Sequence, residues 1–222
     1  MKRIGIVAAL PGELKPLVSG WKKLDGSAWT GLVAGHACVA VAGGMGAEAA
    51  TRACERIFAA GQVDALISVG WAGALSCGVK PPEAFEVKEV VDTLTGERFL
   101  TGQEQGFRLV TLDHVAGVKE KRQLAENYRA VLVDMEAATV ARQAQERGVA
   151  FLCCKGISDG SSDVLPDFSR FISARGQMRL GAFLAHVAVR PRYWGNLARM
   201  GQNSQKAAVA LGRLIEEVVG RI

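Results

Sequence analysis

The chain has 222 residues, of which 49% are hydrophobic and 22% are charged, and its formal net charge is +5. This composition is typical of one globular domain with a sizeable core and excludes a disordered or fibrous chain. The five cysteines, odd in number and without C-x-x-C spacing or nearby histidines, argue against a disulfide framework or a zinc site. We therefore expect buried thiols in a reducing compartment, and neither a metal nor another cofactor.

The chain opens on an apolar run at residues 3–9, which is too short for a signal peptide and is closed by Pro11-Gly12-Glu13. We interpret it as the first strand of a cytoplasmic protein. No apolar run reaches the roughly 18 residues that span a bilayer. Further runs, most of them rich in Val, Ile and Leu like strands buried on both faces, follow at residues 37–42, 65–69, 85–91, 107–112, 130–133 and 149–155.

Helical patterns separate several of these strands. Residues 47–60 carry apolar side chains on one face, and residues 136–147 are rich in alanine and stop at Gly148, a typical helix C-cap. The alternation predicts a layered α/β fold in a single domain, residues 1–222, because no internal repeat or linker interrupts it. Beyond Asp167 the pattern is wholly helical, with predicted helices at residues 168–189, 193–200 and 204–219.

The positive charge lies in the helical C-terminal segment, residues 170–222. This segment has nine basic residues against two acidic ones and carries +7, so residues 1–169 carry −2. It could contact an anionic membrane, or it could be a solvated helix face that keeps the protein soluble. Nucleic-acid binding is disfavoured, because its basic residues lie on predicted helices with few aromatic residues, among them Tyr193 and Trp194, between them.

Carboxylates follow three of the predicted strands, at the ends where α/β folds gather their ligands. Glu13 follows the first strand, Asp134 and Glu136 follow the sixth, and Ser158-Asp159 comes just after the last. Taken singly, each carboxylate has a structural explanation as a helix-start, N-cap or turn residue. The set together indicates one pocket. The glycine turns Gly43-Gly44-Met45-Gly46 and Gly70-Trp71-Ala72-Gly73 fit neither the dinucleotide nor the P-loop motif.

These motifs together resemble the purine nucleoside phosphorylase superfamily. The resemblance covers residues 1 to about 175, and within the superfamily the pattern is most similar to the 5′-methylthioadenosine/S-adenosylhomocysteine nucleosidases. Its most diagnostic parts are Val133-Asp134-Met135-Glu136-Ala137 and Ile157-Ser158-Asp159. The resemblance implies a three-layer α/β/α sandwich with a mixed central sheet, and cleavage of the N-ribosidic bond of a purine nucleoside.

The resemblance also implies roles for individual residues. Asp159 matches the general acid that protonates purine N7, and Glu13 matches the carboxylate that orients the attacking water. Glu136 matches the carboxylate that holds the ribose hydroxyls, with Met135 packed against the sugar. The bond chemistry agrees, because an oxocarbenium-like sugar is stabilised by a carboxylate and the departing base needs a proton. Further substrate contacts are expected from Gly44, Met45, Gly70, Trp71, Val115, Asp134 and Ser158.

Water is the favoured nucleophile. Phosphorylases of this superfamily hold phosphate with arginines, one of them shortly before a Gly-Ser turn, whereas this chain has Ser68-Val69-Gly70-Trp71 at that place. The indole of Trp71 would crowd a phosphate, and no other basic residue lies in the glycine turns. Lys155, just before Ile157-Ser158-Asp159, is the residue most able to overturn this choice.

Two departures from the family pattern bear on the substrate. The segment of residues 78–113 is shorter than in the methylthioadenosine enzymes, and His114-Val115 stands where a phenylalanine commonly covers the base; His114 could also be an ordinary loop residue. A more open pocket would admit a larger 5′ substituent. The alternative is therefore a bacterial hopanoid-associated phosphorylase acting on a lipid-linked adenosyl compound, with the basic segment touching the membrane.

A nucleoside-binding protein without activity is the non-enzyme alternative, although the presence of both Asp159 and Glu13 argues against it. The expected partners are a small-molecule nucleoside and further copies of the chain, in a homodimer or a higher homo-oligomer, with no nucleic acid. The dimer or higher assembly is implied by the resemblance alone.

Overall fold

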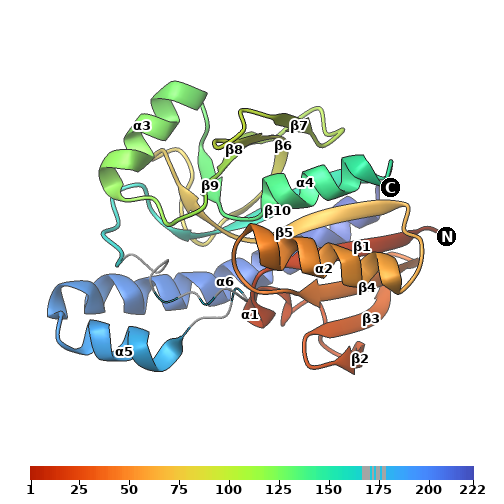
Figure 1. Cartoon of the computed structure of the whole chain (residues 1–222), viewed down its shortest axis with the longest axis horizontal. Coiled ribbons are helices and arrows are strands. Elements are labelled where there is room, and N and C mark those ends of the chain that lie inside the picture. Colours follow the sequence, from red (N-terminus) through yellow and green to blue (C-terminus); the bar gives the residue numbers. More distant parts are fainter. Residues whose placement is uncertain (167–170, 172, 174–175, 177–178) are drawn as a thin grey trace.

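The computed structural model describes the whole chain except residues 167–170, 172, 174–175 and 177–178 (Figure 1). Its strands are β1 (Arg3–Ala8), β2 (Lys22–Asp25), β3 (Ala28–Val33), β4 (His36–Ala42), β5 (Ala65–Ala74), β6 (Ala84–Asp92), β7 (Arg98–Leu100), β8 (Phe107–Thr111), β9 (Leu132–Asp134) and β10 (Ala150–Asp159). Its α-helices are α1 (Pro11–Leu14), α2 (Ala47–Ala59), α3 (Val118–Tyr128), α4 (Ala137–Glu146), α5 (Leu180–Ala188) and α6 (Trp194–Val219).

The strands form one mixed sheet in the order β10-β6-β8-β9-β5-β1-β4-β3-β2, with β7 beside β6. Strand β5 pairs in parallel with β1 and β10 and antiparallel with β9. Because β10 also pairs with β6, the strands β5, β10, β6, β8 and β9 close into a ring. The mixed central sheet that we predicted is confirmed, and part of it is closed on itself.

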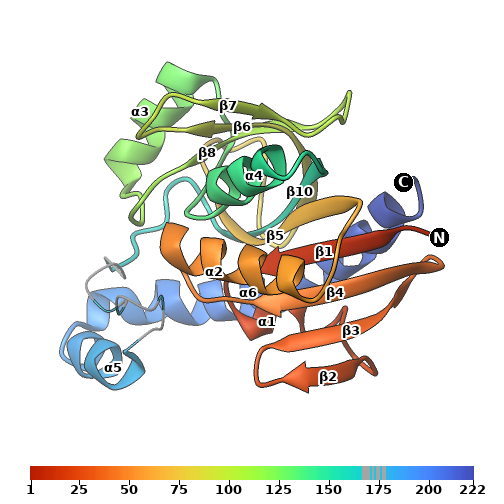
Figure 2. The ribbon, with the colours of Figure 1, turned by 45° about the vertical axis from the view of Figure 1, so that its right-hand side comes forward.

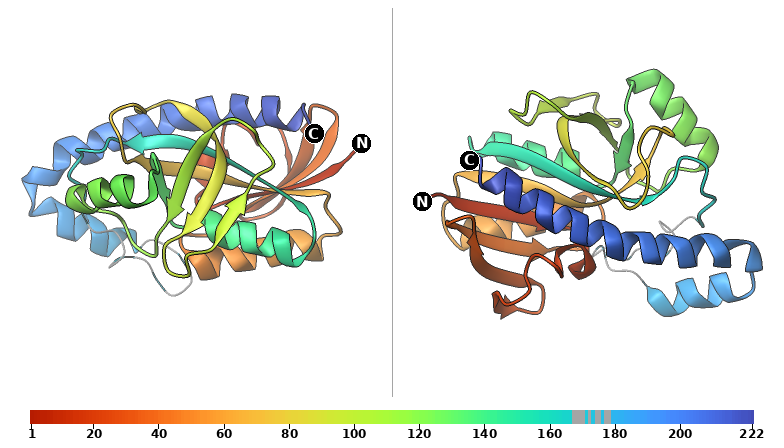
Figure 3. Two further views of the ribbon diagram at one scale, coloured as in Figure 1. Left: turned by 90° about the horizontal axis from the view of Figure 1, so that it is seen from above. Right: turned by 180° about the vertical axis from the view of Figure 1, so that it is seen from behind.

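Helices cover both faces of the sheet. Helices α2 and α4 lie together on one face, over β1, β4, β5 and β10 (Figure 2). Helix α6 crosses the opposite face along β10, β5 and β6, and α1 packs against it (Figure 3). The result is the layered arrangement of helix, sheet and helix that the sequence predicts.

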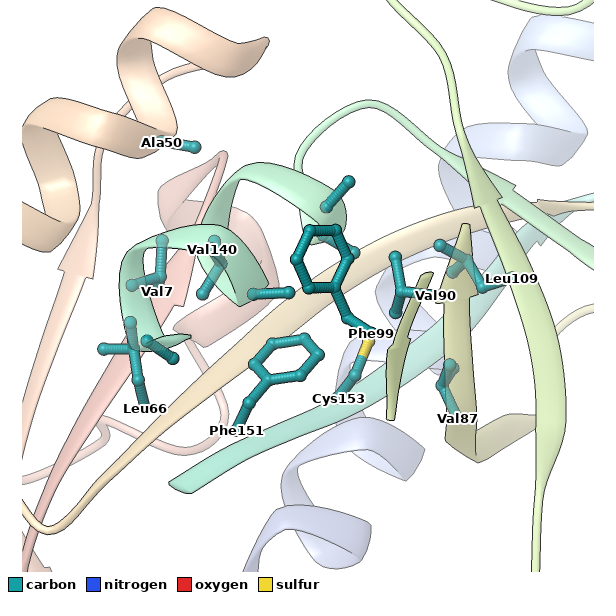
Figure 4. Close-up of a cluster of buried hydrophobic side chains, with 14 of the residues drawn as sticks. Val7, Ala50, Leu66, Val87, Val90, Phe99, Leu109, Val140, Phe151 and Cys153 are labelled. Atoms are coloured by element: carbon teal, nitrogen blue, oxygen red, sulfur yellow. The ribbon is translucent and has the colours of Figure 1, made fainter. Parts of the chain in front are cut away.

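Each face of the sheet has its own apolar core. Under α4, the rings of Phe99 and Phe151 lie beside Val140, Leu109 and Cys153 (Figure 4). On the other face, a second cluster joins Ile4, Ile6 and Ile67 of the sheet to Leu211 and Ile215 of α6. Four of the five cysteines are buried and Cys77 is exposed, and all five are free thiols.

Two strands run farther than predicted. We expected strands to end at residues 69 and 155 and glycine turns to follow, but β5 continues to Ala74 and β10 to Asp159. The two extensions pair with each other, with Gly156 opposite Trp71 and Asp159 opposite Gly73. Ladder hydrogen bonds therefore hold these glycines inside strands, and the carboxylate of Asp159 is placed at the end of the sheet.

The prediction also missed several elements. Strand β2 is exposed along its whole length and has no alternating pattern, and β3 contains Gly31. Helix α3 is mostly polar and buries only Lys121 and Leu124, so its apolar periodicity is weak.

The C-terminal helices also differ from the prediction. We expected separate helices at residues 193–200 and 204–219, but α6 is continuous through Gly201 and Asn203, because its buried face packs on the sheet and outweighs their low helix propensity. The helix predicted at residues 168–189 is observed as α5, Leu180–Ala188, and its earlier part falls largely on residues outside those described.

Candidate active site

A cavity of about 190 Å³ lies at the carboxyl ends of β1, β5, β9 and β10. Nine of the eleven predicted site residues line it: Glu13, Met45, Trp71, Val115, Asp134, Met135, Glu136, Ser158 and Asp159. Residues that the sequence analysis did not assign to the site complete the wall: Ala9, Leu10, Ala72, Gly73, His114, Ala116, Lys121, Val133, Leu165 and Met200.

Gly44 and Gly70 do not line this cavity, so the predicted substrate contacts at these two positions are not supported. Gly44 is held in its turn by the hydrogen bond that its N–H donates to the Ala9 carbonyl, at 2.9 Å. The atoms nearest to the missing Cβ of Gly70 are those of the Glu13 carboxylate. Both glycines therefore shape the backbone that carries the site.

Glu13 is held by backbone donors from two strand ends. Its Oε2 accepts hydrogen bonds from the N–H groups of Ala9 at 2.9 Å and Leu10 at 2.8 Å, and its Oε1 accepts one from Trp71 N–H at 2.8 Å. Burial raises the pKa of this carboxyl above its usual value, although the three N–H donors and Lys155 oppose the rise. The geometry fixes a carboxylate of enhanced basicity at the cavity wall.

Gly70 makes room for this carboxylate. Its φ is +148°, and a Cβ at this position would lie 2.8 Å from Oε1 of Glu13. We expect Gly70→Ala to displace Glu13, to cost about 1–3 kcal/mol of stability through backbone strain, and to reduce catalysis. Urea denaturation and an assay of the N-ribosidic cleavage that the sequence leads us to expect test this.

The matched control for that substitution is Gly35→Ala. Gly35 also has a positive φ, +83°, but no atom lies near its missing Cβ. This control should lose stability and keep its activity. Equal activity in the two variants would contradict the role assigned to Gly70.

Glu136 follows β9 and starts α4. Its Oε1 accepts a hydrogen bond from Gly46 N–H at 2.8 Å, which ties the carboxylate to the turn before α2. Burial and the neighbouring Asp134 raise the pKa of Glu136 to about 8, and Lys155 partly offsets this. The group therefore binds its proton more tightly than an exposed glutamate, and its environment suits hydrogen bonding with neutral hydroxyl groups.

Asp134 is turned toward the protein interior. Its side chain is fully buried, and Oδ2 contacts Lys155 Nζ at 2.8 Å and accepts the Ala137 N–H at 2.9 Å. Oδ1 accepts from Thr111 Oγ1 at 2.7 Å. Because both oxygens are occupied, these contacts favour a role in holding the start of α4 over the direct substrate contact that we predicted.

Lys155 is equally buried and does not line the cavity. Its Nζ also donates to Ser68 Oγ at 3.1 Å, and the neighbouring carboxylates raise its pKa. The sequence analysis named this lysine as the residue most able to support phosphate binding. Its ammonium is instead neutralised by Asp134, below the floor of the site.

Asp159 ends β10 and forms a buried ion pair with Lys121 of α3. Its other oxygen, Oδ1, accepts a hydrogen bond from Ser158 Oγ at 2.6 Å. Lys121 was missed in the sequence because α3 reads as a polar, solvated helix. One signal was present: Lys121 is three residues before Leu124, and the two share the buried face.

The remaining wall is largely apolar. Trp71 is fixed by the hydrogen bond from its Nε1 to the Ser204 carbonyl of α6, at 3.0 Å. Val115, Leu165 and Met200 belong to a small cluster with Phe183 of α5. His114 contacts Asp113 and Glu120, and these two carboxylates raise its pKa. This side of the cavity is suited to apolar groups of a ligand.

Among the described residues, no group of three or more His, Cys, Asp or Glu side chains is arranged to hold a metal ion. In the same part of the chain, no helix combines the length and the apolar character needed to cross a membrane. The groups of the cavity that can contact a ligand are therefore its carboxylates, Lys121 and the apolar side chains of its wall.

Solved structures with the same fold include futalosine hydrolase of Helicobacter pylori, at 15% identity, a TM-score of 0.74 and 100% coverage of both chains. The 5′-methylthioadenosine/S-adenosylhomocysteine nucleosidase of S. pneumoniae, with a transition-state inhibitor, has 19% identity, a TM-score of 0.72 and 98% coverage of both chains. The corresponding nucleosidase of Campylobacter jejuni has 12% identity, a TM-score of 0.73 and 100% coverage of both chains. At these identities the likeness shows the fold alone.

The comparison with curated proteins found no match. The sequence model described as "Phosphorylase superfamily" matches residues 3–116 and 86–188, which together make up most of the chain and include all the carboxylates of the cavity. The chain therefore belongs to the phosphorylase superfamily.

Proposed function

We propose that the protein is a nucleosidase that hydrolyses the N-ribosidic bond of an adenine nucleoside such as 5′-methylthioadenosine or S-adenosylhomocysteine. The observation that carries this proposal is the meeting of Glu13, Glu136 and Asp159, from three separate strand ends, in one cavity. N-glycoside cleavage needs an acid for the leaving base, a base for water and an anion near the sugar cation. The three carboxylates can fill these three roles.

The proposed reaction assigns one step to each group. As the bond between C1′ and the purine nitrogen breaks, its electron pair moves to the purine, and the Asp159 side of the site delivers a proton to N7. Glu136 forms hydrogen bonds with the ribose hydroxyls and, in its ionised form, stabilises the positive sugar. Water adds to C1′ while Glu13, made more basic by burial, takes its proton.

Electrostatics favours water over phosphate as the nucleophile. Among the described residues that line the cavity, Lys121 is the one lysine or arginine, and its charge is matched by Asp159. No unpaired lysine or arginine among these residues is therefore left to neutralise a phosphate dianion. Phosphorolytic cleavage of a 5′-modified adenosine, such as a hopanoid-linked adenosyl compound, remains the second candidate, because Val115, Leu165 and Met200 form an apolar wall suited to a large apolar 5′ group.

The test is adenine release from methylthioadenosine, adenosylhomocysteine and an adenosine with a long alkyl 5′ group, with and without phosphate. We expect release in phosphate-free buffer. We also expect Glu13→Gln to reduce it about 10²–10⁴-fold through loss of the base. Glu48→Gln, which removes an exposed carboxylate of α2, is the control and should leave release unchanged.

Each other outcome has its own meaning. If adenine is released only when phosphate is present, the reaction is phosphorolysis and the proposal of hydrolysis is wrong. Binding of these nucleosides without any adenine release would favour a binding protein over an enzyme.

A further inference from the structure

Lys121 is a buried cation that the reaction as described so far does not use. Its side chain is 2% exposed, yet it lines the cavity. Its Nζ contacts Oδ2 of Asp159 and donates a hydrogen bond to the Gly160 carbonyl at 2.8 Å. An ammonium has three protons to donate, and these two contacts account for two of them.

The ion pair raises a question about the acid step. A general acid must carry a proton, but both oxygens of Asp159 accept hydrogen bonds, one from Lys121 and one from Ser158. In this arrangement both oxygens of Asp159 are acceptors, and the donor hydrogens lie on Lys121 Nζ and Ser158 Oγ. Protonation of the departing purine therefore needs a second group that supplies a proton to Asp159.

We propose that Lys121 supplies, through Asp159, the proton that the departing purine receives; the inference rests on the proposed N-ribosidic cleavage. As electron density reaches the purine, Lys121 passes a proton from Nζ to Oδ2, and Asp159 gives a proton to N7. The ammonium becomes a neutral amine and Asp159 returns to a carboxylate. The proton that water loses leaves through Glu13 to solvent, and solvent reprotonates Lys121, so that protons balance over the cycle.

Gly73 keeps this pair open to a ligand. A Cβ at residue 73 would lie 3.0 Å from Oδ2 of Asp159 and 3.3 Å from Nζ of Lys121. Gly73, Asp159 and Lys121 all line the cavity. The glycine therefore leaves space beside both members of the pair, within the cavity.

The competing explanation is that Lys121 merely neutralises Asp159 and fixes α3 to β10. This structural role would affect every substrate equally, whereas a supplier of protons matters only when the leaving group needs one. The experiment therefore compares adenine release from an adenine nucleoside with 4-nitrophenolate release from 4-nitrophenyl riboside. Nitrophenolate is stable as an anion and departs without a proton.

We expect Lys121→Met to lower adenine release about 100-fold and to leave nitrophenolate release nearly unchanged. Lys121→Arg should show the same split, because a guanidinium keeps the positive charge but does not release a proton. Because Lys121→Arg also preserves the ion pair with Asp159, it can replace Lys121→Met in the test if that variant folds poorly. Lys119→Met, which changes an exposed lysine of the same helix, is the control and should match the unmodified protein on both substrates.

An equal loss on both substrates, or no loss on either, would overturn the inference and leave the proposed function intact. Full adenine release by Lys121→Arg would also overturn it, because charge alone would then suffice. Failure of the unmodified protein to release adenine would overturn the proposed function together with the inference that rests on it.

Discussion

Asp159→Asn is expected to lower adenine release by about 10²–10⁴-fold, the usual contribution of a general acid. An asparagine amide cannot relay a proton to the purine, even though it keeps the size of the side chain. The rate of adenine release in phosphate-free buffer measures the effect. Asp113→Asn, at an exposed carboxylate near the cavity, is the control and should retain activity. Full activity of Asp159→Asn would remove Asp159 from the reaction.

The same substitution is also expected to destabilise the fold by about 3–5 kcal/mol, because it leaves the buried ammonium of Lys121 without its carboxylate. The double variant Asp159→Asn with Lys121→Met removes both charges and should recover most of that stability without recovering activity. Urea denaturation of the two variants separates the two effects. A double variant no more stable than the single one would show that the pair is not coupled.

Lys155→Met is expected to have an equally large effect on stability. It leaves Asp134 as a buried carboxylate without a cation, which costs about 3–5 kcal/mol. For a chain of this length the melting temperature should fall by roughly 10 °C. Activity should fall as well, since Asp134 holds the start of α4 and thereby Glu136. Thermal and urea unfolding, together with adenine release, test both effects.

The control for that experiment is Arg52→Met in the exposed pair of Arg52 and Glu48, whose atoms are 3.6 Å apart. Exposed pairs of this kind contribute little, so a change below about 0.5 kcal/mol is expected. Lys155→Met combined with Asp134→Asn should recover much of the lost stability. If Lys155→Met behaves like Arg52→Met, the buried network does not support the site.

The carboxylates of the site could be predicted because they follow strands, and strands buried on both faces are visible as apolar runs. Glu13, Glu136 and Asp159 are brought to one cavity as expected. Their roles in the reaction stay predictions until the variants are measured. The mixed sheet and its helical layers were also predictable from the alternation of patterns.

The partners of these carboxylates could not be predicted, because ion pairs depend on where separate elements meet. Lys121 lies on a polar helix 38 residues before Asp159, and its three-residue spacing from Leu124 is too weak a signal to show that its side chain points inward. Lys155 stood out in the sequence, but its position below the cavity depends on the register between β10 and β5. Helix α6 likewise continues through Gly201 because its buried face packs against the sheet, which the sequence pattern does not show.

Part of the apolar wall of the cavity comes from a different region of the chain than the reacting groups. The carboxylates and Lys121 come from residues before 160, whereas Leu165 and Met200 belong to the C-terminal part. Under the proposed function, mutations in that part are therefore expected to alter which 5′ groups fit while the reacting groups stay in place. Because of this division, substrate preference can diverge during evolution without loss of the reaction itself. The same residues are a starting point for engineering selectivity.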